Sequence, residues 1–307
     1  MSHKQAPRVT IGVPFFNEEA WLERAVQSVL AQTVEAIEVL LVDDGSTDRS
    51  LSMASAIRDP RVHVLSDGMR RGLPARLNEI TRRASAPLVA RMDADDVAHP
   101  DRLARQLEAL EAQSVDAVGT WIGLMDAQEH PFAVVESASH PASPNDALSR
   151  GLFPHATMLA RRDWLLTHPY DETLTRAEDR DLWCRTVHGS RFAVVDDVLY
   201  LVRTSALRPE FLSDYVTSQR QNRRLALRYG PSLVGLSKTA RTWLSSFGKE
   251  MVFRAAAGLG LDDRLVRRRG RVPRRAERER MQEALDALPR VTACAQETSR
   301  EGPRRQR

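Results

Sequence analysis

The fold is decided by the stretch Leu88-Val89-Ala90-Arg91-Met92-Asp93-Ala94-Asp95-Asp96. Its first half is apolar, as in a strand buried in a parallel sheet, and three carboxylates follow within four residues. An open α/β sheet binds its ligands at the carboxyl ends of its strands. We therefore predict a parallel strand here with a ligand site directly after it.

These clustered carboxylates are costly at a half-buried strand end, because they repel one another and lose hydration. A hard divalent cation with oxygen ligands is the simplest compensation. Asp93 and Asp95 are two residues apart, so an extended chain points them to the same side and Asp96 to the opposite side. One of the pair can then bind a metal directly, and the other through water or a ribose hydroxyl.

Three other interpretations compete with a metal site. An EF-hand loop is disfavoured, because Val97 and Ala98 stand where it needs an oxygen ligand and a glycine. A solvated acidic turn is the simplest alternative. The Asp-x-Asp-x-Val sequence also resembles the nucleophile motif of haloacid-dehalogenase-like phosphatases, which would make Asp93 the nucleophile. That family uses a downstream lysine, and the lysines of this chain are Lys4, Lys238 and Lys249.

The composition is that of a globular protein, with 307 residues, 42% of them apolar and 28% charged. No apolar run reaches the length of a membrane span, and residues 1–8 lack the apolar core of a signal peptide. The two cysteines, Cys184 and Cys294, match no metal or redox spacing. We therefore expect a cytoplasmic protein.

The net charge of +4 conceals an uneven distribution of charge along the chain. Residues 1–202 carry a net charge of −9, whereas residues 203–307 carry +13. The basic end could bind anionic lipid, nucleic acid, an acidic partner or the acidic half of the same chain.

Strands and helices alternate through the first hundred residues. The predicted strands cover residues 9–14, 37–42, 62–65 and 87–92. The second strand ends in Asp43-Asp44, followed by a Gly45 turn, which is typical of a strand-to-helix junction. Predicted helices follow the first strand, with Asn17 as N-cap, and cover residues 72–84. This order predicts a right-handed parallel sheet with a ligand crevice along one edge.

The pattern continues with a helix over 102–110, a strand over 115–121, a hairpin within 122–135, a loop over 139–144, a strand over 155–162 and a helix over 177–185.

Two helical segments follow, over 209–229 and 233–253, and the arginine run over 264–280 is predicted as flexible or only partly helical. The second segment has one apolar face. We expect that face to pack on the catalytic domain or in an oligomer contact, with a membrane interface as the alternative. Its members are Leu233, Leu236, Ala240, Trp243, Leu244, Phe247 and Met251.

The chain resembles the family 2 glycosyltransferases over residues 8–203. Three segments occur in the order and spacing of that family, namely residues 10–19, 41–48 and 92–96. Three further segments are also similar to it, namely residues 72–78, Pro100-Asp101-Arg102-Leu103 and the Glu178-Asp179 pair. The resemblance implies an α/β GT-A fold, with a Rossmann-like, mostly parallel sheet, and an inverting transferase. The expected parts are a donor half (about 8–100), an acceptor half (about 101–203), a helical extension (204–261) and a basic, partly flexible tail (262–307).

The resemblance also implies roles for individual residues. Asp95 would be the main ligand of Mn²⁺ or Mg²⁺, with Asp93 beside it, and Asp179 would be the general base, paired with Glu178. Arg70, Arg71 and Arg76 could contact phosphate or be solvated, and His155 could lie near the diphosphate or the acceptor. The nucleotide-sugar site would be formed by Pro14, Phe15, Asn17, Glu18, Asp44, Gly72, Asn78, Asp93, Ala94 and Asp95.

The implied reaction moves one sugar from a nucleotide-sugar, a UDP-sugar first, to a saccharide or lipid-linked saccharide acceptor. The Gln-x-x-Arg-Trp motif of processive synthases is absent after Asp179, which favours transfer of single sugars. The basic C-terminal region could contact the anionic inner face of a membrane, and we expect no specific nucleic acid. The alternatives are the phosphatase that uses Asp93 and a polyanion-binding protein that acts through its arginine-rich tail.

Overall fold

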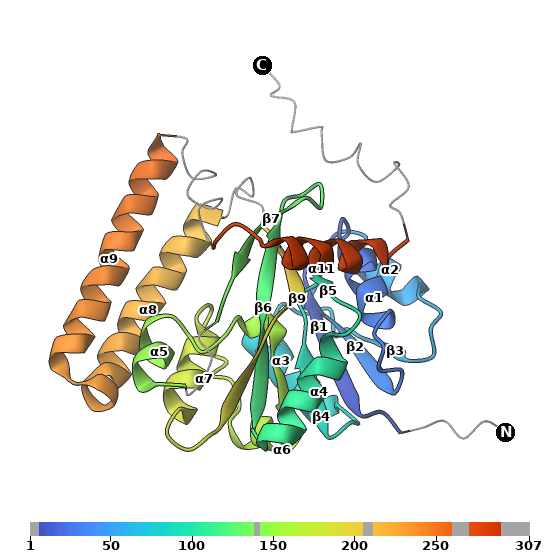
Figure 1. The fold of residues 1–307 in the computed structure, drawn as a ribbon, viewed down its shortest axis with the longest axis horizontal. Helices are drawn as coiled ribbons and strands as arrows, with labels where there is room; N and C mark the ends of the chain where they lie inside the picture. Colours follow the sequence, from blue (N-terminus) through green and yellow to red (C-terminus); the bar gives the residue numbers. More distant parts are fainter. Residues whose placement is uncertain (1–5, 138–141, 205–210, 260–269, 290–307) are drawn as a thin grey trace.

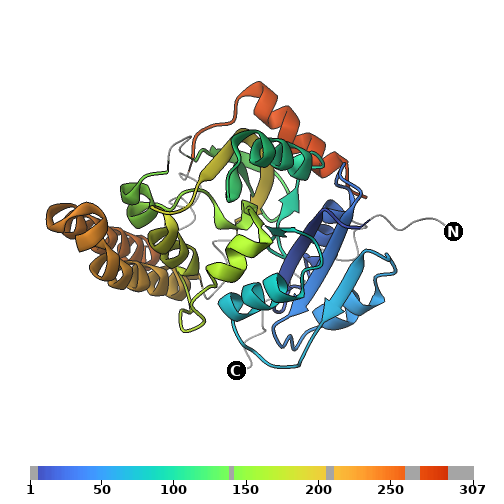
Figure 2. The same cartoon turned by 90° about the horizontal axis from the view of Figure 1, so that it is seen from below.

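The computed structural model describes residues 6–137, 142–204, 211–259 and 270–289. A single mixed sheet runs through the catalytic part, in the order β3-β2-β1-β4-β8-β6-β9-β5, with β7 paired to β6 (Figure 1). Helices cover the sheet, and a pair of long helices stands to one side of it (Figure 2).

The amino-terminal half forms the predicted parallel sheet. Its strands are β1 (Val9–Phe15), β2 (Ile37–Asp43), β3 (Val62–Leu65) and β4 (Leu88–Arg91), and its helices are α1 (Leu22–Leu30), α2 (Ser50–Ala56) and α3 (Leu73–Arg83). Strand β1 pairs in parallel with β2 and β4, and β2 pairs in parallel with β3. All of β1 and nearly all of β2 is buried, as expected for strands with helices on both faces.

The second half makes the sheet mixed. Its elements are β5 (Val97–Ala98), α4 (Arg102–Gln113), β6 (Ala117–Met125), β7 (Pro131–Val135), α5 (Pro144–Ser149), α6 (Arg162–Thr167), α7 (Glu178–Thr186) and β9 (Phe192–Arg203). The strand predicted over 155–162 is wrong in part, because His155–Thr157 forms a 3₁₀ turn and only β8 (Leu159–Arg161) is extended. That short strand is antiparallel to both β4 and β6. Part of the loop predicted over 139–144 lies outside the described residues.

The helical extension consists of α8 (Phe211–Val234) and α9 (Leu236–Gly258), which pack against each other. The buried face of α9 is formed by Thr239, Ser246, Glu250 and Phe253. The predicted apolar face is instead largely exposed, including Leu236, Leu244, Phe247 and Met251. The expectation that this face packs on the catalytic domain is therefore wrong. Among the described helices, none is long and apolar enough to cross a membrane.

Residues 270–289 are not a simple tail, because they include α11 (Arg275–Asp286), which lies across β9, β5 and β7 (Figure 1). Arg271 bridges to Val134 of β7 through backbone hydrogen bonds. Met281 is fully buried and fills the space above Gly123, where an added Cβ would come within 2.2 Å of its sulfur. The partly helical arginine run predicted over 264–280 thus ends inside a helix that completes the core of the catalytic domain.

We predict that Met281→Ala lowers the free energy of unfolding of the catalytic domain by about 2–5 kcal/mol, because it opens a cavity between α11 and the sheet. Met251→Ala is the matched control, since Met251 is 51% exposed on α9, and it should change stability by less than about 0.5 kcal/mol. Urea denaturation followed by far-ultraviolet circular dichroism measures both. Equal effects of the two substitutions would contradict the docking of α11.

Candidate functional site

The candidate site lies at the edge of the sheet where β1, β2 and β4 end. In the register of β1 and β2, Phe15 pairs with Asp43, so the loops that follow these strands begin side by side. Asp44 donates its backbone N–H to the carbonyl of Phe15. The acidic loop after β4 joins this edge, because β4 pairs with the other side of β1.

Asn17 ties two of these loops together and is not the N-cap of α1, which begins at Leu22. Its backbone adopts the left-handed region with φ 54°, which asparagine tolerates better than most residues. Its Oδ1 accepts the N–H of Thr47 at 2.8 Å, and its own N–H donates to Ser46 Oγ. The polar side chain therefore fixes the loop after β1 against the loop after β2.

The two carboxylates after β2 have different tasks. Asp43 is buried and closes the following turn, because it accepts the N–H of Ser46 and the hydroxyl of Ser66. Asp44 accepts the N–H groups of Arg71 and Gly72. Asp44 therefore positions the loop that leads into α3.

Behind Asp44 stands Arg76 of α3, whose side chain is only 1% exposed. It pairs with Asp44 at 3.0 Å, Asp67 at 2.7 Å and Glu79 at 2.9 Å. Burial alone would lower the pKa of Arg76, but these carboxylates raise it. Arg76 is thus a structural cation, and its guanidinium is not free to bind a phosphate. Exposed Arg70 lies over the ring of Phe16 at 3.9 Å, which places one cation over the loop after β1.

The acidic loop after β4 divides its carboxylates as the strand alternation predicts. Asp93 and Asp95 keep exposed surface, whereas Asp96 is buried and accepts the N–H of Arg203 at 2.9 Å. Burial and the charges of Asp95 and Asp93 raise the pKa of Asp96 well above its usual value. The hydroxyl of Tyr200 accepts the N–H of Asp93, which fixes the start of the loop on β9.

Arg203 holds the other end of the acidic loop. Its Nε donates to the carbonyl of Asp95, and its guanidinium lies 3.8 Å from the ring centre of Trp21. Its Nη2 pairs with Glu129 at 2.9 Å, and Glu129 also pairs with Arg24 at 2.7 Å. The loop is thereby pinned to β9, to the hairpin after β6 and to α1.

Asp93 and Asp95 fit a divalent cation in the chemistry of their donors. They offer hard carboxylate oxygens on the exposed side of the loop, and their negative field is strong enough to disfavour ionisation of Asp96. Asp93 also binds Arg91 at 2.7 Å, so one of its oxygens is already used.

A second group of residues could hold an ion by distance alone. His99, Asp101 and Glu283 bring ligand atoms within 4.8 Å of one another. The N–H of Asp101 donates to His99 Nδ1, which leaves the proton on Nε2, facing Glu283. Arg280 lies 3.6 Å from Asp101 and already supplies a cation there. This group is a weaker metal candidate than the acidic loop.

The Glu178-Asp179 pair opens α7 on the far side of Arg91. Glu178 is buried, and its carboxylate lies 3.6 Å from His155 Nδ1. Burial alone would raise the pKa of Glu178, but His155 and the charge of Arg91 lower it to about 2. Arg91 is buried between Asp93 and Glu178, and both charges stabilise its guanidinium. This cation links the acidic loop to α7.

The two acids of this pair are therefore unequal. Glu178 is held as a buried carboxylate, whereas Asp179 is half-exposed and, among the described residues, accepts the N–H of Arg180 at 2.7 Å. His155 Nε2 shares a proton with the hydroxyl of Tyr170 at 2.7 Å, so the histidine also belongs to the buried support. An open carboxylate beside a fixed one is the arrangement expected of a general base and its support.

Most of the predicted site residues lie at this edge, and two of them have side chains that are engaged within the protein. Asn78 donates its amide N–H groups to the carbonyl of Tyr170 and to Glu172, and its oxygen accepts the N–H of Tyr170, so its contact with a nucleotide stays a prediction. The side chain of Phe15 is buried in the core, so only its backbone faces the loops. Glu18, Gly72 and Ala94 lie in the loops themselves.

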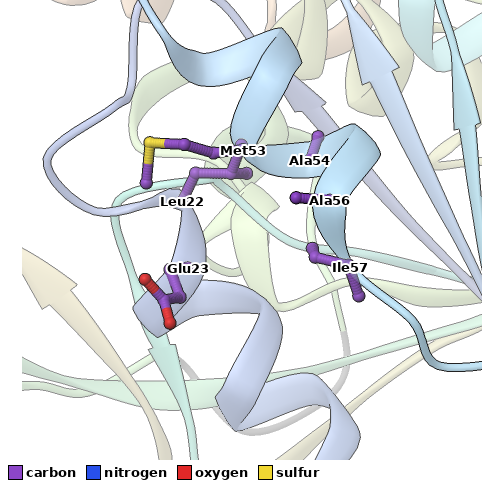
Figure 3. A pocket seen from close by; sticks show the side chains of 6 residues that line it. All are labelled: Leu22, Glu23, Met53, Ala54, Ala56 and Ile57. Atoms are coloured by element: carbon purple, nitrogen blue, oxygen red, sulfur yellow. The ribbon is translucent and has the colours of Figure 1, made fainter.

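Sequence reasoning missed the residues that support the site from below, namely Arg91, Arg203, Tyr170 and Tyr200. The only signal for Arg91 and Arg203 was a charged residue at the end of an apolar strand. A pocket of ≈ 290 Å³ lies between α1 and α2. Figure 3 shows the side chains that line it, which are Leu22, Glu23, Met53, Ala54, Ala56 and Ile57. No predicted site residue lines it.

Comparison with known families matches residues 10–170 to the family described as Glycosyl transferase family 2. EpsE of Bacillus subtilis (strain 168), a glycosyltransferase by name, is 30% identical over 207 residues, which are 64% of this chain and 73% of EpsE. A chondroitin synthase of Escherichia coli is 26% identical over 201 residues, which are 64% of this chain. The match spans only 29% of that synthase.

Solved structures share the fold. Staphylococcus aureus TarS 1–349 in complex with UDP-GlcNAc has a TM-score of 0.60 at 17% identity, over 92% of this chain and 82% of that chain. The mannosyltransferase PcManGT from Pyrobaculum calidifontis, in complex with GDP-Man and Mn²⁺, has a TM-score of 0.57 at 20% identity, over 92% and 86%. These likenesses confirm the predicted GT-A architecture.

The low pKa of Glu178 predicts an acid-sensitive step in stability. Because its pKa is about 2 in the folded protein and near 4.5 when unfolded, its contribution of roughly 3 kcal/mol is present above pH 4.5 and lost as the pH falls toward 2. Glu178→Gln should flatten the pH dependence of the unfolding free energy in that window, as measured by urea denaturation. Glu108→Gln, at a side chain 77% exposed on α4, controls for net charge. An unchanged slope in Glu178→Gln would refute the buried ion pair.

Proposed function

Because the chain belongs to glycosyl transferase family 2 and is a glycosyltransferase, we propose that it transfers one sugar from a nucleoside diphosphate sugar, with inversion, to a hydroxyl of a saccharide or lipid-linked saccharide. The expected process is synthesis of a surface polysaccharide or glycolipid. One observation carries the proposal. Asp93 and Asp95 are half-exposed beyond β4, and the buried guanidinium of Arg91 pairs with Asp93 and is also stabilised by the charge of Glu178 at the start of α7.

UDP is the first choice for the nucleotide. The fold of this chain resembles that of TarS, which has been solved in complex with UDP-GlcNAc, and the strand ends that would receive a nucleotide lie within the residues matched to the family. Asp44 Oδ2 accepts only the N–H of Gly72 among the described donors, so it can accept a further hydrogen bond from a base. The backbone around Pro14 and Phe15 would line the same pocket.

Asp95, with Asp93 beside it, would hold Mn²⁺ or Mg²⁺. The chemistry that such an ion supplies when bound is Lewis-acid neutralisation of the departing diphosphate. The protein's own part is to hold this loop in place. Arg91 donates to the carboxylate of Asp93, Arg203 donates to the backbone carbonyl of Asp95, and the hydroxyl of Tyr200 accepts the backbone N–H of Asp93. Asp96, being buried and bound to Arg203, serves as an anchor for the loop.

Asp179 would take the proton from the acceptor hydroxyl as its oxygen attacks the anomeric carbon. Glu178, fixed by His155 and Arg91, holds the first turn of α7 so that Asp179 faces the acceptor. A single displacement by this oxygen inverts the anomeric configuration. An α-linked donor would therefore give a β-linked product.

The two alternative functions lose support. Family membership does not favour a phosphatase with Asp93 as nucleophile, and the carboxylate of Asp93 is bound by Arg91. A polyanion-binding tail would need free arginines, and two of the described arginines at α11 are held in ion pairs. Arg271 pairs with Glu136 and Glu277, and Arg280 pairs with Asp197.

The proposal predicts that the acidic loop is needed to bind the nucleotide, whereas Asp179 of α7 is needed for the transfer step. Asp95→Asn should abolish metal-dependent binding of UDP, measured by titration calorimetry with Mn²⁺ and with EDTA. Asp179→Asn should bind UDP as the wild type does but release UDP from a UDP-sugar about 10²–10⁴-fold more slowly, because it removes the general base. Both substitutions replace a carboxylate by an amide of the same shape.

GDP and dTDP in the same titration identify the preferred base. Asp126→Asn, in the hairpin between β6 and β7, is the matched control and should leave both readouts unchanged. If the folded wild-type protein binds no nucleotide with Mn²⁺, the donor-site assignment of Asp44, Asp93 and Asp95 fails.

The exposed apolar face of α9 supports a peripheral contact with an anionic membrane at its cytoplasmic face. Leu236, Leu244, Phe247 and Met251 are each at least 45% exposed, and Trp243 stacks on Phe247 with ring centres 5.8 Å apart. Residues 203–307 carry the net charge of +13, which complements anionic lipid. Such a contact would bring the enzyme to a lipid-linked acceptor.

Replacing Leu244 and Met251 by glutamine should weaken binding to phosphatidylglycerol vesicles at least about tenfold in a flotation assay, because two apolar anchors are lost. Leu166→Gln is the control, since Leu166 is 41% exposed on α6 in the catalytic part. Equal binding by the double variant and the control would rule out this face as the lipid contact.

A further inference from the structure

A polar cleft of ≈ 330 Å³ lies between the catalytic domain and the helical extension. Its floor is α8, through Gln219 and Asn222, one wall comes from α5 and α7, and the other wall comes from α9. None of the residues predicted for the donor site lines it. The cleft is therefore a site separate from the strand ends where the nucleotide-sugar is expected.

The lining of this cleft is positively charged without compensation. Arg180 of α7 and Arg241 and Lys249 of α9 face it, and no carboxylate is among the lining residues. Within the described parts of the chain, no ion pair reaches any of these three cations. This contrasts with Arg76 and Arg203, whose guanidiniums pair with carboxylates. Uncompensated cations around a concave surface attract an anion.

The cleft also offers hydrogen-bond donors. Arg180 donates Nη1 to the carbonyl of Leu148, but its Nε is buried and has no hydrogen-bond partner among the described residues. Thr242 and Ser245 of α9 add hydroxyl groups, which rotate to suit a ligand. Arginine, lysine and hydroxyl donors together match the oxygens of a phosphoryl group.

We infer that this cleft binds a phosphoryl anion and, resting on the proposed function, that this anion belongs to the acceptor. Arg180 directly follows Asp179, so the residue that lines the cleft and the proposed general base share the first turn of α7. A phosphorylated or diphosphate-linked saccharide bound here would have its anionic end on α9 and its reacting hydroxyl toward α7. The cleft would then favour acceptors that carry a phosphoryl group over neutral ones.

The test is binding of inorganic pyrophosphate in EDTA, measured by titration calorimetry on the full chain. Arg241→Gln combined with Lys249→Gln should weaken binding at least about tenfold, because two charged partners are lost. Arg224→Gln combined with Lys238→Gln removes the same charge from exposed positions on α8 and α9 that do not line the cleft. That control should bind as the wild type does.

Equal weakening in the two double variants would show a general effect of net charge and overturn the proposal, as would the absence of pyrophosphate binding by the wild type. Phosphatidylcholine vesicles that contain a polyprenyl diphosphate distinguish the source. Weaker vesicle binding by the cleft variant assigns the anion to a lipid-linked acceptor. Unchanged vesicle binding beside weakened pyrophosphate binding assigns it to a soluble phosphorylated saccharide.

Asp95→Asn separates this proposal from the proposed function, because Asp95 does not line the cleft. This variant should lose UDP binding and keep pyrophosphate binding. A protein that binds pyrophosphate in the cleft but no nucleotide would disprove the donor site alone, and a protein that binds nucleotide but no pyrophosphate would disprove the cleft alone.

Discussion

Buried arginines allow the acidic edge of this sheet to exist. Carboxylates crowded at strand ends repel one another, and each group here has a guanidinium placed beneath it in the core. Arg76 supports the end of β2, Arg91 joins the loop after β4 to α7, and Arg203 anchors that loop to β9. Because these cations are held by the fold, the loop that carries Asp93 and Asp95 and the first turn of α7 are in place before any ligand arrives. Such an edge suits the proposed reaction, which moves negative charge onto a departing diphosphate.

The sequence predicts the donor half well because that half is locally encoded. Strands β1 to β4 are short apolar runs that end in turn residues or acids, and a buried parallel strand needs little more to be recognised. The Asp43-Asp44 and Asp93-Asp95 groups could be placed at one edge because parallel strands all end on the same side. The burial of Asp96 opposite Asp93 and Asp95 follows from strand alternation. The hydrogen-bond partners of these carboxylates could not be predicted, since Ser66, Arg76 and Arg203 come from distant parts of the chain.

The failures share one physical cause, which is that periodicity shows which residues are apolar but not where their partner lies. In α9 the apolar stripe predicted an inward face, yet Thr239, Ser246 and Glu250 are buried instead. Ser246 donates to the carbonyl of Gln219 in α8, and Glu250 pairs with Arg223 of the same helix. The local sequence around Asn78 likewise gave no sign of its hydrogen bonds with the backbone of Tyr170. Hydrogen bonds and ion pairs between segments that are far apart in the chain cannot be predicted from the local pattern of polar and apolar residues.

The position of α11 has a consequence for the order in which the protein can be made. Val97, Met125, Val134, Val198 and Leu201 are covered by Met281, Ala284 and Leu285. Arg24 of α1 donates to the carbonyl of Pro289, which lies 265 residues later in the chain. During synthesis the amino-terminal sheet can fold early, but this apolar patch stays open to water until the ribosome has released α11. A nascent chain stalled before that point would present the patch to chaperones or to other unfinished copies.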